Sequence, residues 1–157
     1  MGDFQKLSKS LEDYLEVMYH LEMDKRVIKV TDIAEELDVK PPSVVEAVNK
    51  ISAMNLASYE KYGKIKLTRK GIEIAEEINH KHITLKNFLN ILDIDDEIAE
   101  KEACAMEHIL SNSTVDKFEK FTKFVGMHRD EGHFTKSFNY YRKHNKMPDK
   151  IRCKHSH

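Results

Sequence analysis

The sequence predicts a mainly α-helical fold that contains one small β-hairpin. Glycine and proline are scarce among the 157 residues, with 5 and 3 copies, so few positions would interrupt a helix. Apolar residues recur at helical spacing over long stretches, whereas the segment around Gly63 has the short apolar–polar pattern of paired strands. These observations favour helices over a β-sandwich or a β-barrel.

Composition limits the class of protein further. Hydrophobic residues make up 40% of the chain and charged residues 34%, which is typical of globular proteins with many surface helices. No apolar run approaches the roughly 20 residues that a membrane span needs, and the first ten residues lack the apolar core of a signal peptide. The two cysteines, Cys104 and Cys153, do not form a disulfide framework, so we expect a cytoplasmic protein with no membrane association.

Three helices are expected near the N-terminus. Residues 7–24 have a helical apolar period, with Ser8 or Ser10 as the N-cap. A short helix follows at 30–39 with Thr31 as its N-cap, and a third at 43–56 with Pro42 in its first turn. Two short helices separated by the break at Lys40-Pro41-Pro42 form the helix-turn-helix pattern.

The next segment predicts the hairpin. Tyr59 and Lys61 on one side of Gly63, and Ile65 and Leu67 on the other, indicate two short strands. A helix-turn-helix followed by a lysine-rich hairpin is typical of a winged helix that binds DNA. The simpler alternative is that these lysines only solvate a hairpin edge.

Further helices are expected after the hairpin. Thr68 would cap a long helix from Arg69 to about Leu92, and two more are expected at about 96–110 and 113–125. The remainder, 127–157, has aromatic residues compatible with one helix before a disordered end.

Charge is distributed unevenly along the chain. Residues 40–70 hold seven basic and two acidic residues, whereas residues 73–107 hold ten acidic and three basic residues. This asymmetry suggests one surface for a polyanion and another for cations.

The clearest chemical signal is the segment Cys104-Ala-Met-Glu107-His108. Spacings of three and four place the thiol, carboxylate and imidazole on one face of a helix. These groups are poor core formers and good metal ligands. A single cysteine in a helix is more often a small buried hydrophobe, so the assignment depends on the combination.

Several segments, in this order, resemble the diphtheria-toxin-repressor/MntR family of metal-dependent transcriptional repressors. They are SLEDYLEVMYHLE, VTDIAEELDVKPPSVVEAVNKI, GKIKLTRKGIEIAEEINHKH and EACAMEHILS, and the resemblance covers roughly residues 7–125. We therefore expect the architecture of the shorter members, without the additional SH3-like domain of longer ones. The resemblance implies a winged-helix DNA-binding domain at 1–72, a helical metal-binding and dimerisation domain at 73–126, and a C-terminal tail at 127–157.

The resemblance also implies a metal site built from distant segments. Asp13 and Glu16 match the acidic pair that supplies ligands in the MntR-like branch, and His82 matches the ligand histidine of the long helix. The fifth helix would contribute the rest, so that the implied ligands are Asp13, Glu16, His82, Cys104, Glu107 and His108.

The ligand set combines two branches of that family. The acidic pair resembles the manganese-sensing branch and Cys104 the iron-sensing branch, so we expect Fe(II) or Mn(II), with Zn(II) or Co(II) able to bind in vitro. The ancillary site of the iron branch is not reproduced, because Lys86 stands where an acid is expected and Glu100 where a histidine is expected. Glu100 lies one turn before Cys104, which leaves a variant second site open.

The expected partner is a palindromic double-stranded DNA operator bound by a homodimer. The recognition helix would read bases through its first residues, and lysines there and on the wing would contact phosphates. The candidate DNA-contacting residues are Thr31, Lys40, Pro41, Pro42, Ser43, Glu46, Lys50, Lys61 and Lys64. An apolar dimer interface is expected from Ile98, Met106, Ile109, Leu110, Val115 and Phe118.

Three alternatives remain at this stage. A winged-helix regulator of a non-metal signal would keep its DNA affinity in the presence of chelator. A structural metal site would unfold when a ligand is removed. A metallohydrolase is disfavoured because the sequence has no HExxH motif and no evident base beyond the ligands, so we expect neither enzymatic activity nor a small-molecule substrate.

Overall fold

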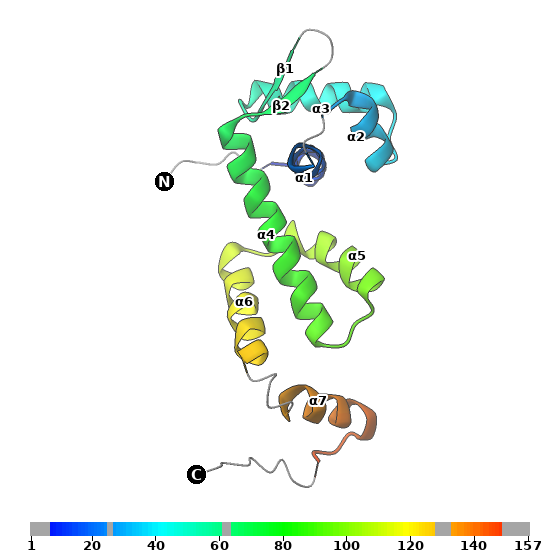
Figure 1. Cartoon of the computed structure of the whole chain (residues 1–157), viewed down its shortest axis with the longest axis vertical. Coiled ribbons are helices and arrows are strands. Elements are labelled where there is room, and N and C mark those ends of the chain that lie inside the picture. Colours follow the sequence, from blue (N-terminus) through cyan, green and yellow to red (C-terminus); the bar gives the residue numbers. More distant parts are fainter. Residues whose placement is uncertain (1–6, 25–26, 61–63, 128–132, 149–157) are drawn as a thin grey trace. The chain divides into compact units, whose positions relative to one another are not determined.

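The computed structural model describes residues 7–24, 27–60, 64–127 and 133–148. It confirms the mainly helical prediction with one two-stranded antiparallel sheet (Figure 1). The chain divides into two compact units, Met1–Lys81 and His82–His157, here called the first and second units. No helix among the described residues is long and apolar enough to cross a membrane. The elements in chain order are α1 (Lys9–Met23), α2 (Val30–Glu36), α3 (Pro41–Ala53), β1 (Ala57–Tyr59), β2 (Ile65–Leu67), α4 (Arg69–Ile91), α5 (Asp96–Glu107), α6 (Asn112–Met127) and α7 (His133–His144).

Helix α1 begins where the sequence predicts. The Ser8 side chain accepts a hydrogen bond from the Leu11 backbone N–H at 3.4 Å, which satisfies one of the free amides of the first turn. One face of α1 is buried in the apolar core of the first unit. Asp13 and Glu16 lie on the same helix and are half-buried. The buried residues of α1 are Tyr14, Leu15, Met18 and Leu21.

The start of α2 differs from the prediction. Thr31 is not the N-cap, because the helix begins at Val30 and the cap position is Lys29, whose side chain makes no capping hydrogen bond. The cause lies outside the local sequence. The Ile65 backbone N–H donates to the Ile28 carbonyl at 3.2 Å, so strand-like pairing holds the chain extended until immediately before the helix.

Helix α3 follows a tight turn in which Asp38 has a positive φ of 50°. Its first turn contains Pro41 and Pro42, where an amide donor is not needed. The helix begins two residues earlier than expected, and its two faces differ clearly. Val44, Ala47, Val48 and Ile51 are buried, whereas Ser43, Glu46 and Lys50 are exposed. The exposed face is therefore the one that can meet a ligand.

The hairpin packs beside α3 within the first unit (Figure 1). Ala57 pairs with Leu67 and Tyr59 with Ile65, and the inward-facing Ile65 and Leu67 are buried. A carboxylate oxygen of Glu22 on α1 accepts a hydrogen bond from the Leu67 backbone N–H at 3.1 Å. This bond ties the edge of the wing to α1, a contact that the sequence did not predict.

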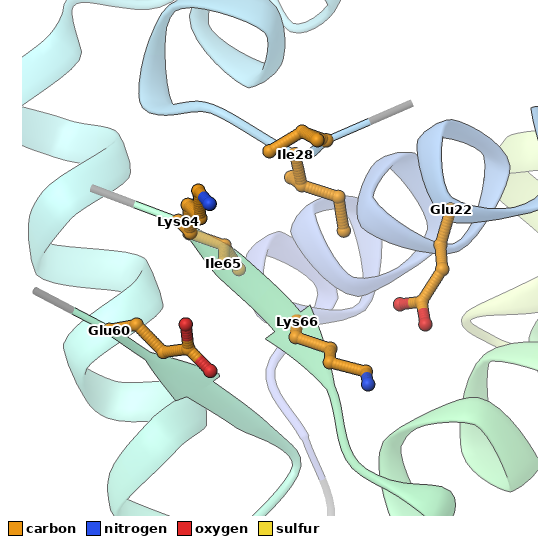
Figure 2. Close-up of a pocket in the computed structure, with 7 residues that line it drawn as sticks. Glu22, Ile28, Glu60, Lys64, Ile65 and Lys66 are labelled. Carbon is orange, nitrogen blue, oxygen red and sulfur yellow. The ribbon is translucent and has the colours of Figure 1, made fainter. Parts of the chain in front are cut away.

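A cavity of about 310 Å³ lies between the hairpin and the segment that precedes α2 (Figure 2). Its wall combines apolar side chains with both signs of charge. The lining residues are Glu22, Val27, Ile28, Glu60, Lys64, Ile65 and Lys66.

Thr68 caps α4 as predicted, since its hydroxyl oxygen accepts a hydrogen bond from the Gly71 N–H at 3.0 Å. Gly71 permits a close approach between α4 and the chain before β1. A Cβ atom at this position would lie 1.9 Å from the Leu56 carbonyl oxygen, so any larger residue would displace the backbone.

The second unit has a smaller apolar cluster. Leu85 and Leu89 from α4 and Ala99 and Ala103 from α5 are buried, and Phe118 from α6 packs against them. Helix α7 is attached through Arg142, which donates to the Leu92 carbonyl at 2.8 Å and lies 3.0 Å from an Asp93 carboxylate oxygen. Among the described residues, this unit therefore buries fewer apolar side chains than the first unit.

Candidate metal centre

The second unit brings four of the six expected ligands together around the end of α5. His82 projects from α4, Cys104 and Glu107 from α5, and His108 is the C-cap of α5. The His82 Nδ1 atom lies 2.8 Å from Glu107 Oε2, and His108 Nε2 lies 3.5 Å from Glu107 Oε1. Glu107 is therefore flanked by two imidazoles.

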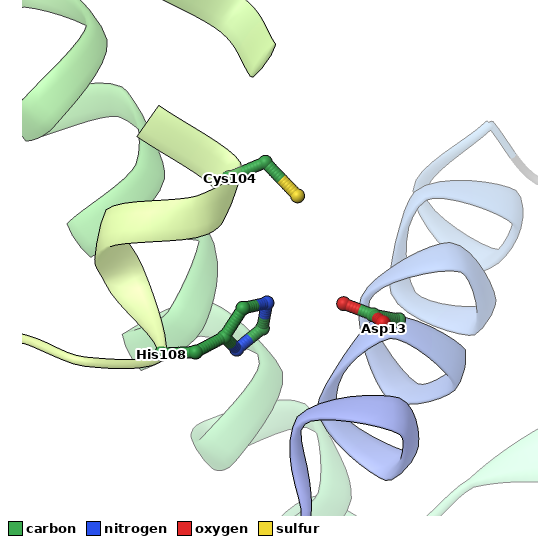
Figure 3. A group of neighbouring side chains, drawn as sticks. All are labelled: Asp13, Cys104 and His108. Atoms are coloured by element: carbon green, nitrogen blue, oxygen red, sulfur yellow. The ribbon is translucent and has the colours of Figure 1, made fainter. Parts of the chain in front are cut away.

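Cys104 and His108 form a second pair of donors in the same region. Their candidate ligand atoms, a thiol sulfur and an imidazole nitrogen, lie within 4.8 Å of one another. Figure 3 shows Cys104 on α5 and His108 at the C-terminal end of that helix, and it also draws Asp13 of α1. Asp13 and Glu16 belong to the first unit, where both are half-buried and a Glu16 carboxylate oxygen lies 3.7 Å from His20 Nε2.

Burial of Glu107 supports a cation-binding role. The residue is only 3% exposed, and a buried carboxylate is costly unless its oxygens meet a positive charge or hydrogen-bond donors. Within the described ranges, Oε1 has no hydrogen-bond partner, while Oε2 faces His82. Together with a thiol and two imidazoles, this oxygen makes a donor set that fits a divalent transition metal.

A network of opposite charges borders this centre. One Glu100 oxygen lies 2.9 Å from His82 Nε2 and the other 2.7 Å from the Lys86 ammonium. Lys86 also lies 3.2 Å from an Asp96 oxygen. The hydrogen bond from Lys86 is the main reason that the pKa of Glu100 is lowered, and the two carboxylates likewise raise the pKa of Lys86. Helical periodicity does not predict this network, because Lys86 and Glu100 are on different helices.

The candidate DNA-contacting residues are on the surface of the first unit. Of the nine, Lys61 lies outside the described residues, and the other eight are all exposed: Thr31, Lys40, Pro41, Pro42, Ser43, Glu46, Lys50 and Lys64.

Two of these residues are paired with each other. The Lys50 ammonium lies 2.7 Å from a Glu46 carboxylate oxygen, and this hydrogen bond is the main reason that the pKa of Glu46 is lowered. Lys50 would have to exchange this partner to contact a phosphate.

The predicted dimer interface is only partly exposed in the chain. Ile98 and Ile109 are 51% and 82% exposed, as an interface requires. Val115, in contrast, is 3% exposed, and Met106, Leu110 and Phe118 pack against the core of their own unit. Exposed apolar side chains that the prediction did not include are Phe121, Phe124 and Met127 on α6.

Comparison with known proteins agrees with this arrangement. Residues 6–65 match the family described as iron dependent repressor, N-terminal DNA binding domain, and residues 68–132 match iron dependent repressor, metal binding and dimerisation domain. An HTH-type transcriptional regulator of Methanocaldococcus jannaschii is 40% identical over 117 residues, which are 73% of this chain and 94% of that protein. The HTH-type transcriptional regulator MntR of Oceanobacillus iheyensis is 39% identical over 108 residues, 69% of this chain and 74% of that protein.

A solved structure shows the same fold. The structure of the manganese regulator SloR has 32% sequence identity and a TM-score of 0.66, and the match covers 73% of this chain. It spans only 54% of SloR, so this chain corresponds to about half of that longer protein. With two matched domains covering most of its length, the chain belongs to the iron-dependent repressor family of metal-dependent, DNA-binding transcriptional regulators.

Proposed function

We propose that this chain is a repressor that binds a divalent cation and, when loaded, binds operator DNA as a homodimer. The observation that carries the proposal is Glu107, a buried carboxylate between His82 and His108 with one oxygen left without a hydrogen bond in the described part of the chain. A divalent cation supplies the positive charge that such a donor set lacks.

The proposed ligands come from both units. Asp13 and Glu16 on α1 join His82, Cys104, Glu107 and His108 of the second unit. Brought together without a cation, the acidic side chains would repel one another, and their common attraction to a cation would link α1 to α5. Because α1 belongs to the same unit as the recognition helix α3, that link would favour one arrangement of the DNA-binding units. A preference of about 1–3 kcal/mol would change operator affinity roughly 5–150-fold.

Fe(II) and Mn(II) are the cations that we propose. Three carboxylates suit the hard Mn(II) ion, whereas the Cys104 thiolate shifts preference toward Fe(II), and toward Zn(II) or Co(II) in vitro. Related proteins support both choices, since the matched family is described as iron dependent and SloR as a manganese regulator.

The exposed face of α3 is the proposed reading surface. Its first turn presents Pro41, Pro42 and Ser43, a small surface that can approach base edges or thymine methyl groups in the major groove. Lys40 and Lys64 are exposed cations suited to phosphate contacts. We infer a palindromic operator because a homodimer presents two such surfaces related by symmetry.

The exposed apolar residues of the second unit are the proposed dimer contact. Ile98 and Ile109 are 51% and 82% exposed, and the matched family domain is described as a dimerisation domain. A regulator of this kind acts on cytoplasmic DNA, and we assign it neither catalytic activity nor a small-molecule substrate. Genes for metal-ion uptake are the proposed targets.

The decisive experiment first selects operator sequences from a random duplex library with the Mn(II)-loaded protein. Binding to the selected duplex is then titrated with Mn(II), Fe(II), Zn(II) and Co(II), each with and without chelator. We expect at least 5-fold tighter binding with the cognate cation and reversal by chelator. Equal affinity in every condition would support a regulator of a non-metal signal.

A single substitution distinguishes a metal that regulates DNA binding from a metal that only stabilises the fold. His108→Ala is expected to remain folded by circular dichroism and to lose the response of DNA binding to metal. Unfolding of this variant together with unfolding of the wild type by chelator would instead indicate a structural site.

A further inference from the structure

The His82 ring is held between two carboxylates that face opposite edges of the imidazole. Glu107 lies 2.8 Å from Nδ1, and Glu100 lies 2.9 Å from Nε2. The two carboxylates differ in their surroundings, since the Glu107 side chain is 1% exposed and the Glu100 side chain 54% exposed. The buried side of the ring therefore faces the candidate centre, and the other side faces the surface.

Glu100 is itself fixed by a cation of the protein. Its second oxygen lies 2.7 Å from the Lys86 ammonium, which also lies 3.2 Å from Asp96. Both Glu100 oxygens are thus engaged, one with His82 and one with Lys86. This arrangement disfavours the variant second metal site that the sequence left open at Glu100, because a metal there would displace Lys86.

An imidazole binds a metal through one nitrogen, and the neutral ring then carries its proton on the other. Nδ1 is the nitrogen on the side of Glu107, so the proton of a metal-bound His82 belongs on Nε2, where Glu100 can accept it. We propose that Glu100, held in place by Lys86, is a positioning residue that accepts the Nε2–H of His82 and thereby presents Nδ1 to the cation. The inference rests on the proposed function, since it requires His82 to be a ligand.

The alternative is an ordinary surface ion-pair network that only joins α4 to α5. Such a network would affect folding stability slightly and leave metal affinity unchanged. A positioning role predicts instead that the carboxylate matters for metal binding, because loss of an outer hydrogen-bond partner of a metal-bound histidine typically weakens binding about 10–100-fold.

The test compares Glu100→Gln with Glu102→Gln, a matched loss of one exposed carboxylate on the same helix. Mn(II) affinity of the full chain is measured by isothermal titration calorimetry. We expect Glu100→Gln to bind Mn(II) about 10–100-fold more weakly and Glu102→Gln to remain within about 2-fold of wild type. Lys86→Met, which removes the ammonium and keeps the stem, should give a smaller loss in the same direction.

Nitrogen-15 NMR of the histidine-labelled, Zn(II)-loaded protein provides a second readout that a structural role would not change. Wild type should show His82 bound through Nδ1 and protonated at Nε2, and Glu100→Gln should show part of the His82 population with Nδ1 not bound to the metal. Unchanged Mn(II) affinity and an unchanged nitrogen pattern in Glu100→Gln would overturn the inference.

His82→Ala distinguishes this failure from failure of the proposed function. If His82→Ala binds Mn(II) as tightly as wild type, His82 is not a ligand, and both the proposed centre and the positioning role are wrong. If it binds more weakly, the double variant with Glu100→Gln should lose nothing further, because Glu100 acts through His82. An additional loss in the double variant would contradict the positioning role.

Discussion

The two units of the molecule are stabilised in different ways. The first unit encloses a continuous apolar core to which α1, α2, α3, both strands and the start of α4 contribute. The second unit buries fewer apolar side chains, namely two leucines, two alanines and two valines, and it also buries the carboxylate of Glu107. Apolar burial contributes roughly 25 cal/mol per Å², whereas burial of an incompletely paired carboxylate costs free energy.

This difference indicates which unit depends on a ligand. Because its core is apolar, we expect the first unit to remain folded in the absence of metal. The second unit keeps a destabilising group at the position where a cation would stabilise it, which is the expected arrangement for a sensor. Single substitutions in the core of the first unit should therefore change mainly folding stability. Substitutions at the proposed centre in the second unit should change mainly metal binding.

The largest expected effect tests the core of the first unit. Leu15→Ala should lower the free energy of unfolding by about 2–5 kcal/mol, because Leu15 is fully buried and its loss leaves a cavity. Urea denaturation followed by circular dichroism measures this change. The control is Met23→Ala on the same helix, where 51% exposure predicts less than about 0.5 kcal/mol. If the two variants lose similar free energy of unfolding, burial in the apolar core is not what stabilises the first unit.

The next largest effect concerns Glu107 in the second unit, where a substitution should weaken metal binding without lowering metal-free stability. Glu107→Gln should weaken Mn(II) binding at least about 100-fold, equivalent to about 2.7 kcal/mol, because it removes the proposed central anionic ligand. Without metal, the same change should leave the free energy of unfolding unchanged or raise it, since a buried charge disappears. Calorimetry gives the affinity and urea denaturation the stability. A marked loss of metal-free stability would show that Glu107 is chiefly structural.

The features that could be predicted from sequence are those that depend on local chemistry. Ser8 and Thr68 cap their helices through hydrogen bonds that span three residues, and the alternation of buried and exposed positions in α3 follows its helical period. The proposed ligands at the end of α5 are close together because they are close in sequence. Helical spacing is sufficient for such predictions.

The features that could not be predicted depend on pairing between distant segments. Thr31 was wrongly expected to cap α2 because the pairing of Ile28 with Ile65 sets where that helix begins. The contact of Lys86 with Glu100 requires the turn between α4 and α5, where Asp93 adopts a φ of 62°. Val115 was expected at the dimer interface, but helical periodicity does not distinguish an intramolecular core from an intermolecular one.

A smaller effect concerns the DNA-binding surface. Lys64→Ala should weaken binding to all duplexes by a few-fold and reduce the slope of log affinity against log salt concentration by about 0.9, because the proposed phosphate contact is lost. Fluorescence anisotropy at several salt concentrations measures both quantities. Lys123→Ala is the control, since Lys123 is paired with Glu119 on α6 of the second unit. An equal change of slope in both variants would mean that Lys64 has no specific contact.

The smallest expected effect is a pH dependence confined to the second unit. The hydrogen bond from Lys86 lowers the pKa of Glu100 below its ordinary value of 4.5, so the folded state favours the carboxylate form. The resulting stabilisation is present above pH 4.5 and is lost as the pH falls through the lowered pKa. In metal-free protein, the difference in free energy of unfolding between wild type and Glu100→Gln should therefore shrink on acidification from pH 6 to pH 3. Glu46→Gln provides the comparison for an exposed ion pair of the first unit. If the difference in free energy of unfolding between wild type and Glu100→Gln stays constant from pH 6 to pH 3, the Glu100–Lys86 pair contributes no ionic stabilisation.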